Sequence, residues 1–329
     1  MRHLAALVLL ASLAAATTAR TAGDPPALVL EDKIPLGNVS GRIDHMAFDR
    51  EHQLLFVAEL GNNSVGVVDV KAKKVVHRLT GLREPQGVGY HRGTRTLYVA
   101  DAGDGSVHLY QAPDFSPAGT IALGDDADNI RVDPQGGRVA VGYGSGGLAI
   151  IDPASRKKVQ DIKLKVHPEG FQFDGTDKRL FVNLPDARTI GIVDLDQGVQ
   201  VNTIDTVGAR ANFPMAIDTV LHRVLSVFRS PHKLMAFGVE DGKLTVATDT
   251  CGDSDDVFVD GPRNRVYVSC GEGLIDVFAV ATNGYERIGR LPTVSGARTS
   301  LYVPTTDRLY LGVRASGREP AAIWVFKPQ

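Results

Sequence analysis

Several signatures of common enzyme and binding classes are missing from these 329 residues. No Cys-x-x-Cys-His run occurs, which excludes a c-type haem attached by this chain, and no Gly-x-Ser-x-Gly elbow occurs, which excludes an α/β-hydrolase serine. Lys and Arg number 36 against 38 Asp and Glu, so no basic excess indicates a nucleic-acid partner. No segment keeps a 3.6-residue apolar period long enough for a helix. Glycine, by contrast, is abundant at 35 residues, as many tight turns require.

The first 22 residues differ from the rest of the chain. Arg2 is followed by an apolar run over residues 4–15 and then by small residues up to Ala22. This order is typical of a secretory signal peptide, and the run is too short to span a bilayer. No second apolar stretch reaches spanning length. We therefore expect a signal peptide over residues 1–22 and a soluble periplasmic or secreted domain over 23–329, with no membrane span.

A short apolar run recurs along the remaining chain. Leu-Phe-Val-Ala at residues 55–58 returns in related form six times, at spacings of 41 to 44 residues: 97–100, 139–142, 180–183, 224–227, 266–269 and 309–312. Each copy lies among four short runs rich in Val, Ile, Phe and Leu, which Gly, Asn, Asp and Pro separate. Runs of this kind are typical of strands and turns. Four strands in about 40–45 residues are the pattern of one propeller blade.

Seven copies predict an all-β fold, a seven-bladed β-propeller with four-stranded antiparallel blades. One strand-like run within residues 27–40 precedes the first blade, and the last unit, 297–329, is one strand short. An unpaired outer strand would expose backbone donors and acceptors. We therefore expect the ring to close by pairing the N-terminal strand with the last blade, in a single domain.

The repeats resemble a known family. The Leu-Phe-Val-Ala and Leu-Tyr-Val-Ala runs, the stretch Gly-Asn-Asn-Ser-Val-Gly-Val-Val-Asp at 61–69 and the period of about 42 residues are similar to the YVTN-type repeats of exported bacterial seven-bladed β-propellers. The resemblance covers nearly the whole mature chain. It implies the fold, whereas propellers host binding proteins, lyases, lactonases and electron-transfer enzymes alike. Lactonases and lyases in related propeller families carry a metal or an acid/base pair at the mouth of the central channel.

Equivalent positions at the start of the seven inner strands carry polar side chains. The first position, four residues before the last apolar residue of each inner strand, holds Asp44, Gln86, Asp128, Glu169, Phe213, Asp255 and Thr299. The next position holds His45, Gly87, Asn129, Gly170, Pro214, Asp256 and Ser300. All inner strands of a propeller begin at one mouth of the channel, so these residues should form a ring. Loops after the second strands should bring further charged residues to the same face, namely Glu59, Asp101, Asp186, Arg229, Glu272 and Arg314, with Arg42, Arg210 and Arg298 nearby. The predicted ligand-binding residues are Asp44, His45, Gln86, Asp128, Asn129, His167, Glu169, Asp255, Asp256 and Arg298.

Two interpretations of this ring remain open. Carboxylates at strand starts commonly accept hydrogen bonds from turns and face water, which would make the ring a polar rim. Alternatively, acids around a narrow mouth need compensation by arginines, raised pKa values or a bound cation. Oxygen ligands suit hard cations, so the candidate cofactor is a divalent cation such as calcium, with Asp128 and Glu169 as its metal ligands.

Three functions follow from these alternatives. The first is an exported scaffold that binds a small molecule or a periplasmic protein on the channel-mouth face. The second is a metal-assisted lactonase or lyase, in which a cation polarises a carbonyl and His45, His167 or a carboxylate moves a proton. The third is an accessory subunit of an exported redox enzyme. The regular repeats without a complete catalytic motif favour the first.

The two cysteines are expected to form a disulfide. Cys251 enters the sixth blade and Cys270 ends its second strand, so both reach the same face. The predicted compartment is oxidising, and these are the only cysteines in the chain.

Overall fold

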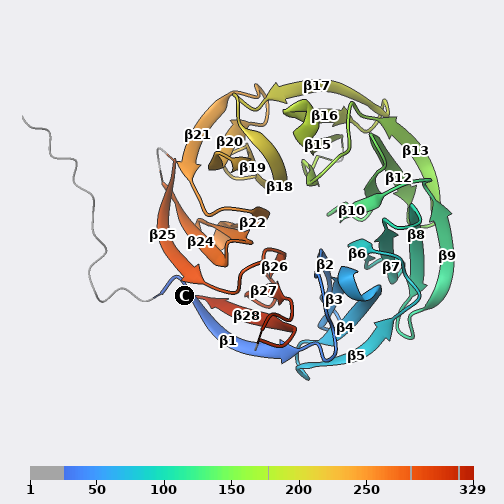
Figure 1. Ribbon diagram of the computed structural model, residues 1–329. Helices are drawn as coiled ribbons and strands as arrows, with labels where there is room; N and C mark the ends of the chain where they lie inside the picture. Colours follow the sequence, from blue (N-terminus) through green and yellow to red (C-terminus); the bar gives the residue numbers. More distant parts are fainter. Residues whose placement is uncertain (1–25, 177, 282–283, 318) are drawn as a thin grey trace, which may run out of the picture.

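The computed structural model describes residues 26–176, 178–281, 284–317 and 319–329, so the predicted signal peptide lies outside the described part of the chain. Seven four-stranded antiparallel sheets stand in a ring around a central channel (Figure 1). In the described residues the only helices are three single 3₁₀ turns, at Leu60–Asn62, Pro185–Ala187 and Gly261–Arg263. The prediction of an all-β, seven-bladed propeller is confirmed.

The first three blades follow one another along the chain from the innermost to the outermost strand. Blade one contains β2 (Met46–Asp49), β3 (Leu54–Glu59), β4 (Ser64–Asp69) and β5 (Lys74–Leu79). Blade two contains β6 (Pro85–His91), β7 (Thr96–Asp101), β8 (Ser106–Gln111) and β9 (Ser116–Ala122). Blade three contains β10 (Ala127–Val132), β11 (Val139–Tyr143), β12 (Gly147–Asp152) and β13 (Lys157–Lys163).

Blades four to six repeat this order, and blade seven takes one strand from the N-terminal end. Blade four contains β14 (Phe171–Phe173), β15 (Arg179–Leu184), β16 (Thr189–Asp194) and β17 (Val199–Asp205). Blade five contains β18 (Arg210–Asp218), β19 (Arg223–Ser230), β20 (His232–Gly238) and β21 (Leu244–Asp249). Blade six contains β22 (Ser254–Asp260), β23 (Arg265–Cys270), β24 (Leu274–Ala281) and β25 (Gly284–Pro292). Blade seven contains β26 (Ser300–Val303), β27 (Arg308–Val313), β28 (Ala322–Pro328) and β1 (Leu28–Pro35).

The recurring apolar runs form the second strand of each blade, where both faces of the sheet are covered. Leu55, Phe56, Val57 and Ala58 in β3 are all fully buried, because neighbouring blades pack on either side. Burial on both faces removes the alternation of apolar and polar residues that a half-exposed strand shows. Outermost strands such as β5 are largely exposed. The core is therefore a series of apolar layers between blades, and a blade cannot bury its faces without its neighbours.

The ring closes through its two ends, as predicted. β1 pairs antiparallel with β28, in a register that places Leu28 opposite Pro328 and Ile34 opposite Ile323. In Figure 1 the blue first strand lies beside the red last strand. Leu28 packs into the layer between blades six and seven, and Ile34 packs into the layer between blades seven and one. The first strand therefore joins three blades.

The inner strands bend where they reach the channel mouth. A register shift interrupts the pairing of four of them with their second strands, between Pro85 and Val88, Ala127 and Ile130, Asn212 and Met215, and Ser254 and Asp256. A β-bulge re-aims the side chains that it contains. The bulged segments hold predicted site residues such as Asp128 and Asp255, so the local backbone turns them toward the cavity.

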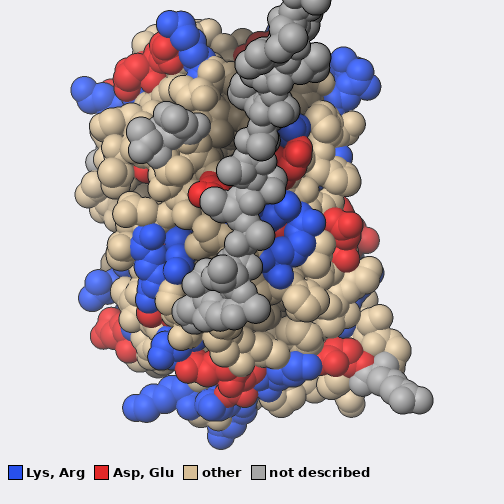
Figure 2. Space-filling model, turned by 90° about the vertical axis from the view of Figure 1, so that its left-hand side faces the viewer, with Lys and Arg blue, Asp and Glu red and all other residues tan. Residues whose placement is uncertain are grey.

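The disulfide between Cys251 and Cys270 is present and buried, with the two Cα atoms 5.9 Å apart. This confirms the predicted pair. Lys, Arg, Asp and Glu side chains are interspersed on the side of the ring drawn in Figure 2, without a continuous basic stripe there. Among the described residues, no helix has the length and hydropathy needed to cross a bilayer.

Candidate ligand-binding site at the channel mouth

The predicted ring lines a cavity of about 290 Å³ at one end of the channel. The structure brings nine of the ten predicted residues to its wall: Asp44, His45, Gln86, Asp128, Asn129, His167, Glu169, Asp255 and Arg298. They come from the starts of inner strands in six different blades. Ring symmetry therefore gathers residues that are far apart in the chain, as the repeat pattern predicted.

Asp256, the tenth residue, lies deeper than expected. It borders a second cavity of about 350 Å³, which continues down the channel and shares His45 and Arg131 with the mouth. Its carboxylate accepts a hydrogen bond from the backbone N–H of Ser300 at 2.7 Å. Burial, with the charge of Asp255 beside it, raises the pKa of Asp256 well above its usual value. The register shift between Ser254 and Asp256 places the two neighbouring carboxylates at different depths.

Two arginines on the blade-six side are held by carboxylates. Arg229 contacts Asp253 at 3.2 Å and Asp255 at 2.6 Å, and Arg298 contacts the same two acids at 2.9 and 3.1 Å. Arg229 also lies over the ring of Phe213, 4.0 Å from its centroid. Both guanidinium groups are thus engaged, and their charges are compensated locally.

A third arginine pairs with a carboxylate at the start of blade one. Arg42 lies 2.5 Å from the carboxylate of Asp44, which burial holds at a raised pKa of about 6 although Arg42 opposes that shift. The adjacent ring of His45 is buried, and burial together with the positive charge of Arg131 lowers its pKa to about 4. His45 is therefore neutral at physiological pH.

His167 carries a positive charge. Its Nδ1 atom donates a hydrogen bond to the carbonyl of Gly144 at 2.6 Å, and its Nε2 atom lies 3.6 Å from Oδ2 of Asp128. The Asp128 carboxylate raises the pKa of His167 to about 9. A ring with acceptors at both nitrogens is favoured as the doubly protonated imidazolium.

The carboxyl group of Glu169 has a strongly raised pKa. Burial raises the pKa of Glu169 to about 8, and the negative charge of Asp128 adds to this, while His167 opposes it. Within the described chain, no side chain forms a hydrogen bond or ion pair with the Glu169 carboxyl group. A carboxyl group with a pKa of about 8 is mostly protonated at neutral pH, because burial disfavours its charged form.

Two buried oxygens at the mouth lack hydrogen-bond donors. Asn129 is 3% exposed and Asp128 is 8% exposed, and no donor in the described residues reaches Oδ1 of either side chain. One oxygen of Asp128 faces His167, so the other is the unsatisfied one. Buried polar atoms are nearly always paired, and leaving one unpaired costs about 1–3 kcal/mol. Both residues line the mouth cavity, so this wall of the cavity contains polar groups that the protein itself does not satisfy.

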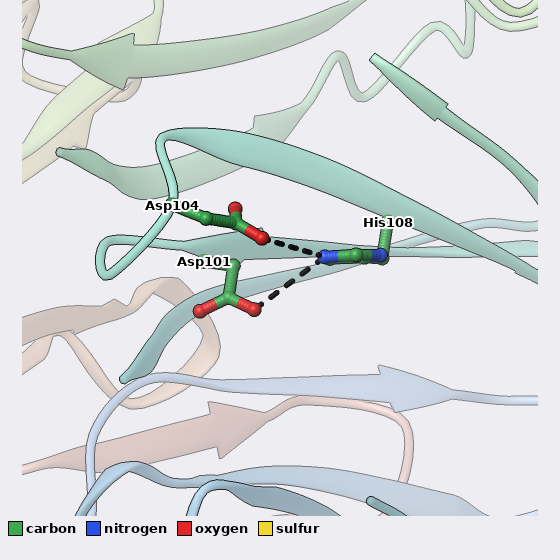
Figure 3. Close-up of side chains that lie close together, drawn as sticks. All are labelled: Asp101, Asp104 and His108. Carbon is green, nitrogen blue, oxygen red and sulfur yellow. Dashed lines mark ion pairs between the residues drawn. The ribbon is translucent and has the colours of Figure 1, made fainter. Parts of the chain in front are cut away.

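The most compact group of potential metal ligands lies elsewhere. Among the described residues, the one set of three or more Asp, Glu, Cys or His ligand atoms within 4.8 Å of one another is Asp101, Asp104 and His108 (Figure 3). The backbone N–H of Arg83 already donates to the Asp101 carboxylate, shared between its two oxygens at 2.8 Å each. The mouth carboxylates are more widely spaced than this group. The assignment of Asp128 and Glu169 as metal ligands stays a prediction.

The cluster in Figure 3 is not a catalytic triad. Asp101, Asp104 and the hydroxyl of Ser106 all approach the same ring nitrogen of His108, Nε2, at 3.4, 3.7 and 3.0 Å. A triad needs the acid and the hydroxyl on opposite nitrogens. A buried ion pair occupies the corresponding place in blade one, where Glu59 binds Arg78 at 2.9 Å. Glu59 and Asp101, expected to reach the mouth, are instead fully buried within their own blades.

Sequence reasoning missed three charged residues of this region, namely Asp126, Arg131 and Asp253. Arg131 had a detectable signal: the same place in the other inner strands holds the uncharged residues Ala47, Gly89, Gln172, Ala216, Phe258 and Leu301. A lone charge within an inner strand points to the channel. Asp126 and Asp253 precede bulged strands, and their approach to His167 and Arg229 depends on loop paths that the repeat does not specify.

The fold is shared with solved structures of remote sequence. A chain in the structure titled "Kuenenia stuttgartiensis Hydrazine Synthase" superposes with a TM-score of 0.73 at 16% identity, covering 88% of this chain and 97% of that chain. A chain in "Crystal Structure of Mitotic Checkpoint Complex" superposes with a TM-score of 0.79 at 13% identity, covering 98% and 99% of the two chains. The protein is therefore a seven-bladed β-propeller. Neither the protein-family models nor the curated proteins contain a match to this sequence.

Proposed function

We propose that this protein is an exported binding protein, and that its ligand is a small polar molecule held in the channel-mouth cavity. The observation that carries the proposal is the cavity of about 290 Å³ at the channel mouth, whose wall is formed largely by polar and charged residues from around the ring, Asp128 and Asn129 among them, each with one buried oxygen that lacks a donor among the described residues. A polar cavity with a few convergent groups is the usual form of a ligand site. A mere polar rim would leave these oxygens exposed to water or bonded to turns.

Export is supported by two features. The sequence of residues 1–22 has the order of a signal peptide, and the Cys251–Cys270 disulfide suits an oxidising compartment. Cell fractionation of the full-length chain in its host tests this part separately. Mature protein that starts near residue 23 and appears outside the cytoplasm supports export, whereas an uncleaved cytoplasmic chain refutes it.

Thermal melting with a ligand panel tests the binding function. The panel contains divalent cations, organic amines, carboxylates, sugars and lactones, each applied to the wild type and to Asp128→Asn. A ligand at a hundred times its Kd stabilises the folded state by about 2.7 kcal/mol, which raises the Tm by about 4 °C in a chain of this length. We expect one class to raise the Tm of the wild type and to lose most of that effect in the variant. A panel without any shift, or with equal shifts in both proteins, would refute the proposal.

A second candidate is a hydrolase or lyase that acts on a lactone or cyclic ester. The observation that favours it is the acid/base pair of Glu169 and His167 at the mouth, since neighbouring groups with displaced pKa values are common at catalytic sites. Elemental analysis and lactone hydrolysis, with and without EDTA, test this candidate. EDTA-sensitive turnover that Glu169→Gln abolishes would replace the binding proposal with the enzymatic one.

A further inference from the structure

One arginine of the channel has no counter-ion. Arg131 lies in β10 and borders both the mouth cavity and the channel cavity below it. Within the described chain, no carboxylate forms an ion pair with its guanidinium group, although the charges of Asp256 and Asp128 act on it from a greater distance. Its contacts there are a hydrogen bond from Nη1 to the carbonyl of Ile130 at 2.8 Å and the ring of Phe171, whose centroid is 5.9 Å away.

The free edge of this guanidinium group has the shape of a carboxylate site. Nε and Nη2 donate to no acceptor among the described residues, and they do not belong to the unpaired atoms that the protein encloses completely. Because Arg131 is half-buried on an inner strand that borders the channel, these accessible nitrogens face its cavities. Nε–H and one N–H of Nη2 point in the same direction, so this edge can bind both oxygens of one carboxylate.

Arg131 also dominates the charge of the channel cavity. The other titratable side chains on that wall are His45, Tyr90 and Asp256. His45 is neutral at physiological pH, because burial and the charge of Arg131 lower its pKa to about 4. Burial raises the pKa of Tyr90 to about 12 and favours the protonated form of Asp256, whose pKa is also raised. The cavity therefore has room for one negative charge, beside Arg131.

The remaining wall of this cavity is largely apolar. Its volume is about 350 Å³, which is within the usual range for sites of small molecules. The apolar side chains that line it include Met46, Val88, Ile130, Met215, Val257 and Leu301. A phosphate dianion would find no second cation on this wall, whereas an aliphatic chain would gain from burial against it. The chemistry of the cavity thus fits a molecule with one anionic end and an apolar body.

The acids of the mouth oppose such a molecule only weakly, because they have cations beside them. The pairs are Arg42 with Asp44, His167 with Asp126 and Asp128, and Arg229 and Arg298 with Asp255. Glu169, with its raised pKa, is mostly protonated at neutral pH. None of these acids lines the channel cavity itself. An anion can therefore pass the mouth and reach Arg131.

We propose that the channel below the mouth is a second binding site, for a small aliphatic monocarboxylate whose two oxygens bind the Nε and Nη2 edge of Arg131. Its chain lies along the apolar wall of the channel. Two charge-assisted hydrogen bonds compensate a half-buried guanidinium group that the protein leaves without a counter-ion. The inference goes beyond the proposed function, since it concerns a different cavity and a different residue.

Isothermal titration calorimetry tests this inference with n-hexanoate, butyrate, 1-hexanol, n-hexylammonium and inorganic phosphate. The proteins are the wild type, Arg131→Gln, Arg131→Lys and a control, Arg92→Gln, which changes an exposed residue in the turn between β6 and β7. We expect the wild type and the control to bind hexanoate with equal Kd and to ignore hexylammonium and phosphate. Arg131→Gln should weaken hexanoate binding about tenfold or more, and Arg131→Lys by less, since lysine keeps the charge but loses the paired edge. Butyrate should bind more weakly than hexanoate, by about fourfold for each CH₂ group removed.

Several results would overturn the inference. Hexanoate that fails to bind the wild type, or that binds Arg131→Gln as tightly, would show that water alone solvates Arg131. Equal Kd values for hexanoate and hexanol would show that the charge plays no part. Hexanoate binding that Asp128→Asn abolishes and Arg131→Gln preserves would place the carboxylate in the mouth.

The proposed function and this inference can fail separately. The melting panel with Asp128→Asn judges the mouth, whereas the Arg131 variants judge the channel. Circular dichroism of each variant separates a lost ligand contact from a lost fold. If Arg131→Gln does not fold, the comparison of hexanoate with hexanol and with Arg131→Lys decides the claim.

Discussion

Closure of the ring by β1 is predicted to stabilise the whole propeller, and the substitution Ile34→Ala tests it. Ile34 is 1% exposed and packs into the layer that joins blade seven to blade one. Removing three buried carbons costs about 2.4 kcal/mol of transfer free energy, and the cavity left behind raises the total to about 3 kcal/mol. The unfolding entropy of a chain of this length is about 0.6 kcal/mol/K, so the Tm should fall by about 5 °C.

A neighbouring residue of the same strand supplies the control. Leu30→Ala also removes three carbons, but Leu30 is 40% exposed, so its loss should lower the stability by less than about 1 kcal/mol. The single tryptophan, Trp324, lies opposite Lys33 in β28 and reports on the closing blade by fluorescence. Circular dichroism reports on all seven blades at once.

We expect Ile34→Ala to shift the fluorescence and circular dichroism transitions together, because the blades depend on one another for burial. If the fluorescence transition alone shifts, the first strand unfolds locally, and its pairing does not stabilise the other blades. Equal effects of Ile34→Ala and Leu30→Ala would also contradict the reasoning, since the two differ in burial and not in the number of atoms removed.

Three further predictions concern the disulfide, the mouth backbone and pH. Replacing both Cys251 and Cys270 with Ala should cost about 3 kcal/mol in chemical denaturation, because the closed loop spans 19 residues. Gly87→Ala should destabilise the protein and weaken ligand binding, since a Cβ there would lie 1.9 Å from a backbone oxygen of blade three, whereas Gly261→Ala meets nothing within 4 Å and should be mild. The free energy of unfolding should fall as the pH rises from about 4.5 to about 8, and Glu169→Gln should flatten this dependence.

The sign of the pH effect follows from the raised pKa. Folded Glu169 binds its proton more tightly than the unfolded chain does, so its contribution is complete below pH 4.5 and is lost through pH 8. An unchanged slope in Glu169→Gln would show that other groups cause the dependence. The disulfide prediction fails if the double variant melts like the wild type under oxidising conditions. The backbone prediction fails if Gly87→Ala and Gly261→Ala have equal effects.

The sequence was sufficient for the architecture because the architecture is repeated. Seven copies of a buried second strand, such as residues 55–58, indicate seven blades, and one surplus strand with one missing strand indicates their closure. The ring of mouth residues followed from the same symmetry, because equivalent positions meet around one axis. Because the pattern occurs seven times, one blade with a less regular sequence did not change the prediction.

Details within a blade were not predictable in the same way. Glu59 and Asp101 lie at strand ends that reach the mouth face, yet each turns inward to bind a basic partner in its own blade. Asp256 differs from Asp255 in depth because the β-bulge in β22 sets the register there. A bulge depends on how two strands pair and leaves no fixed residue pattern. The pairing of arginines with acids likewise depends on loop paths that differ between blades.

The central claim is that the channel mouth binds a small polar molecule. A crystal structure of the protein soaked with the ligand class that raises its Tm tests it most directly. The account predicts one molecule in the mouth cavity, in contact with Asp128 or Asn129. A molecule bound only outside the cavity would contradict the account.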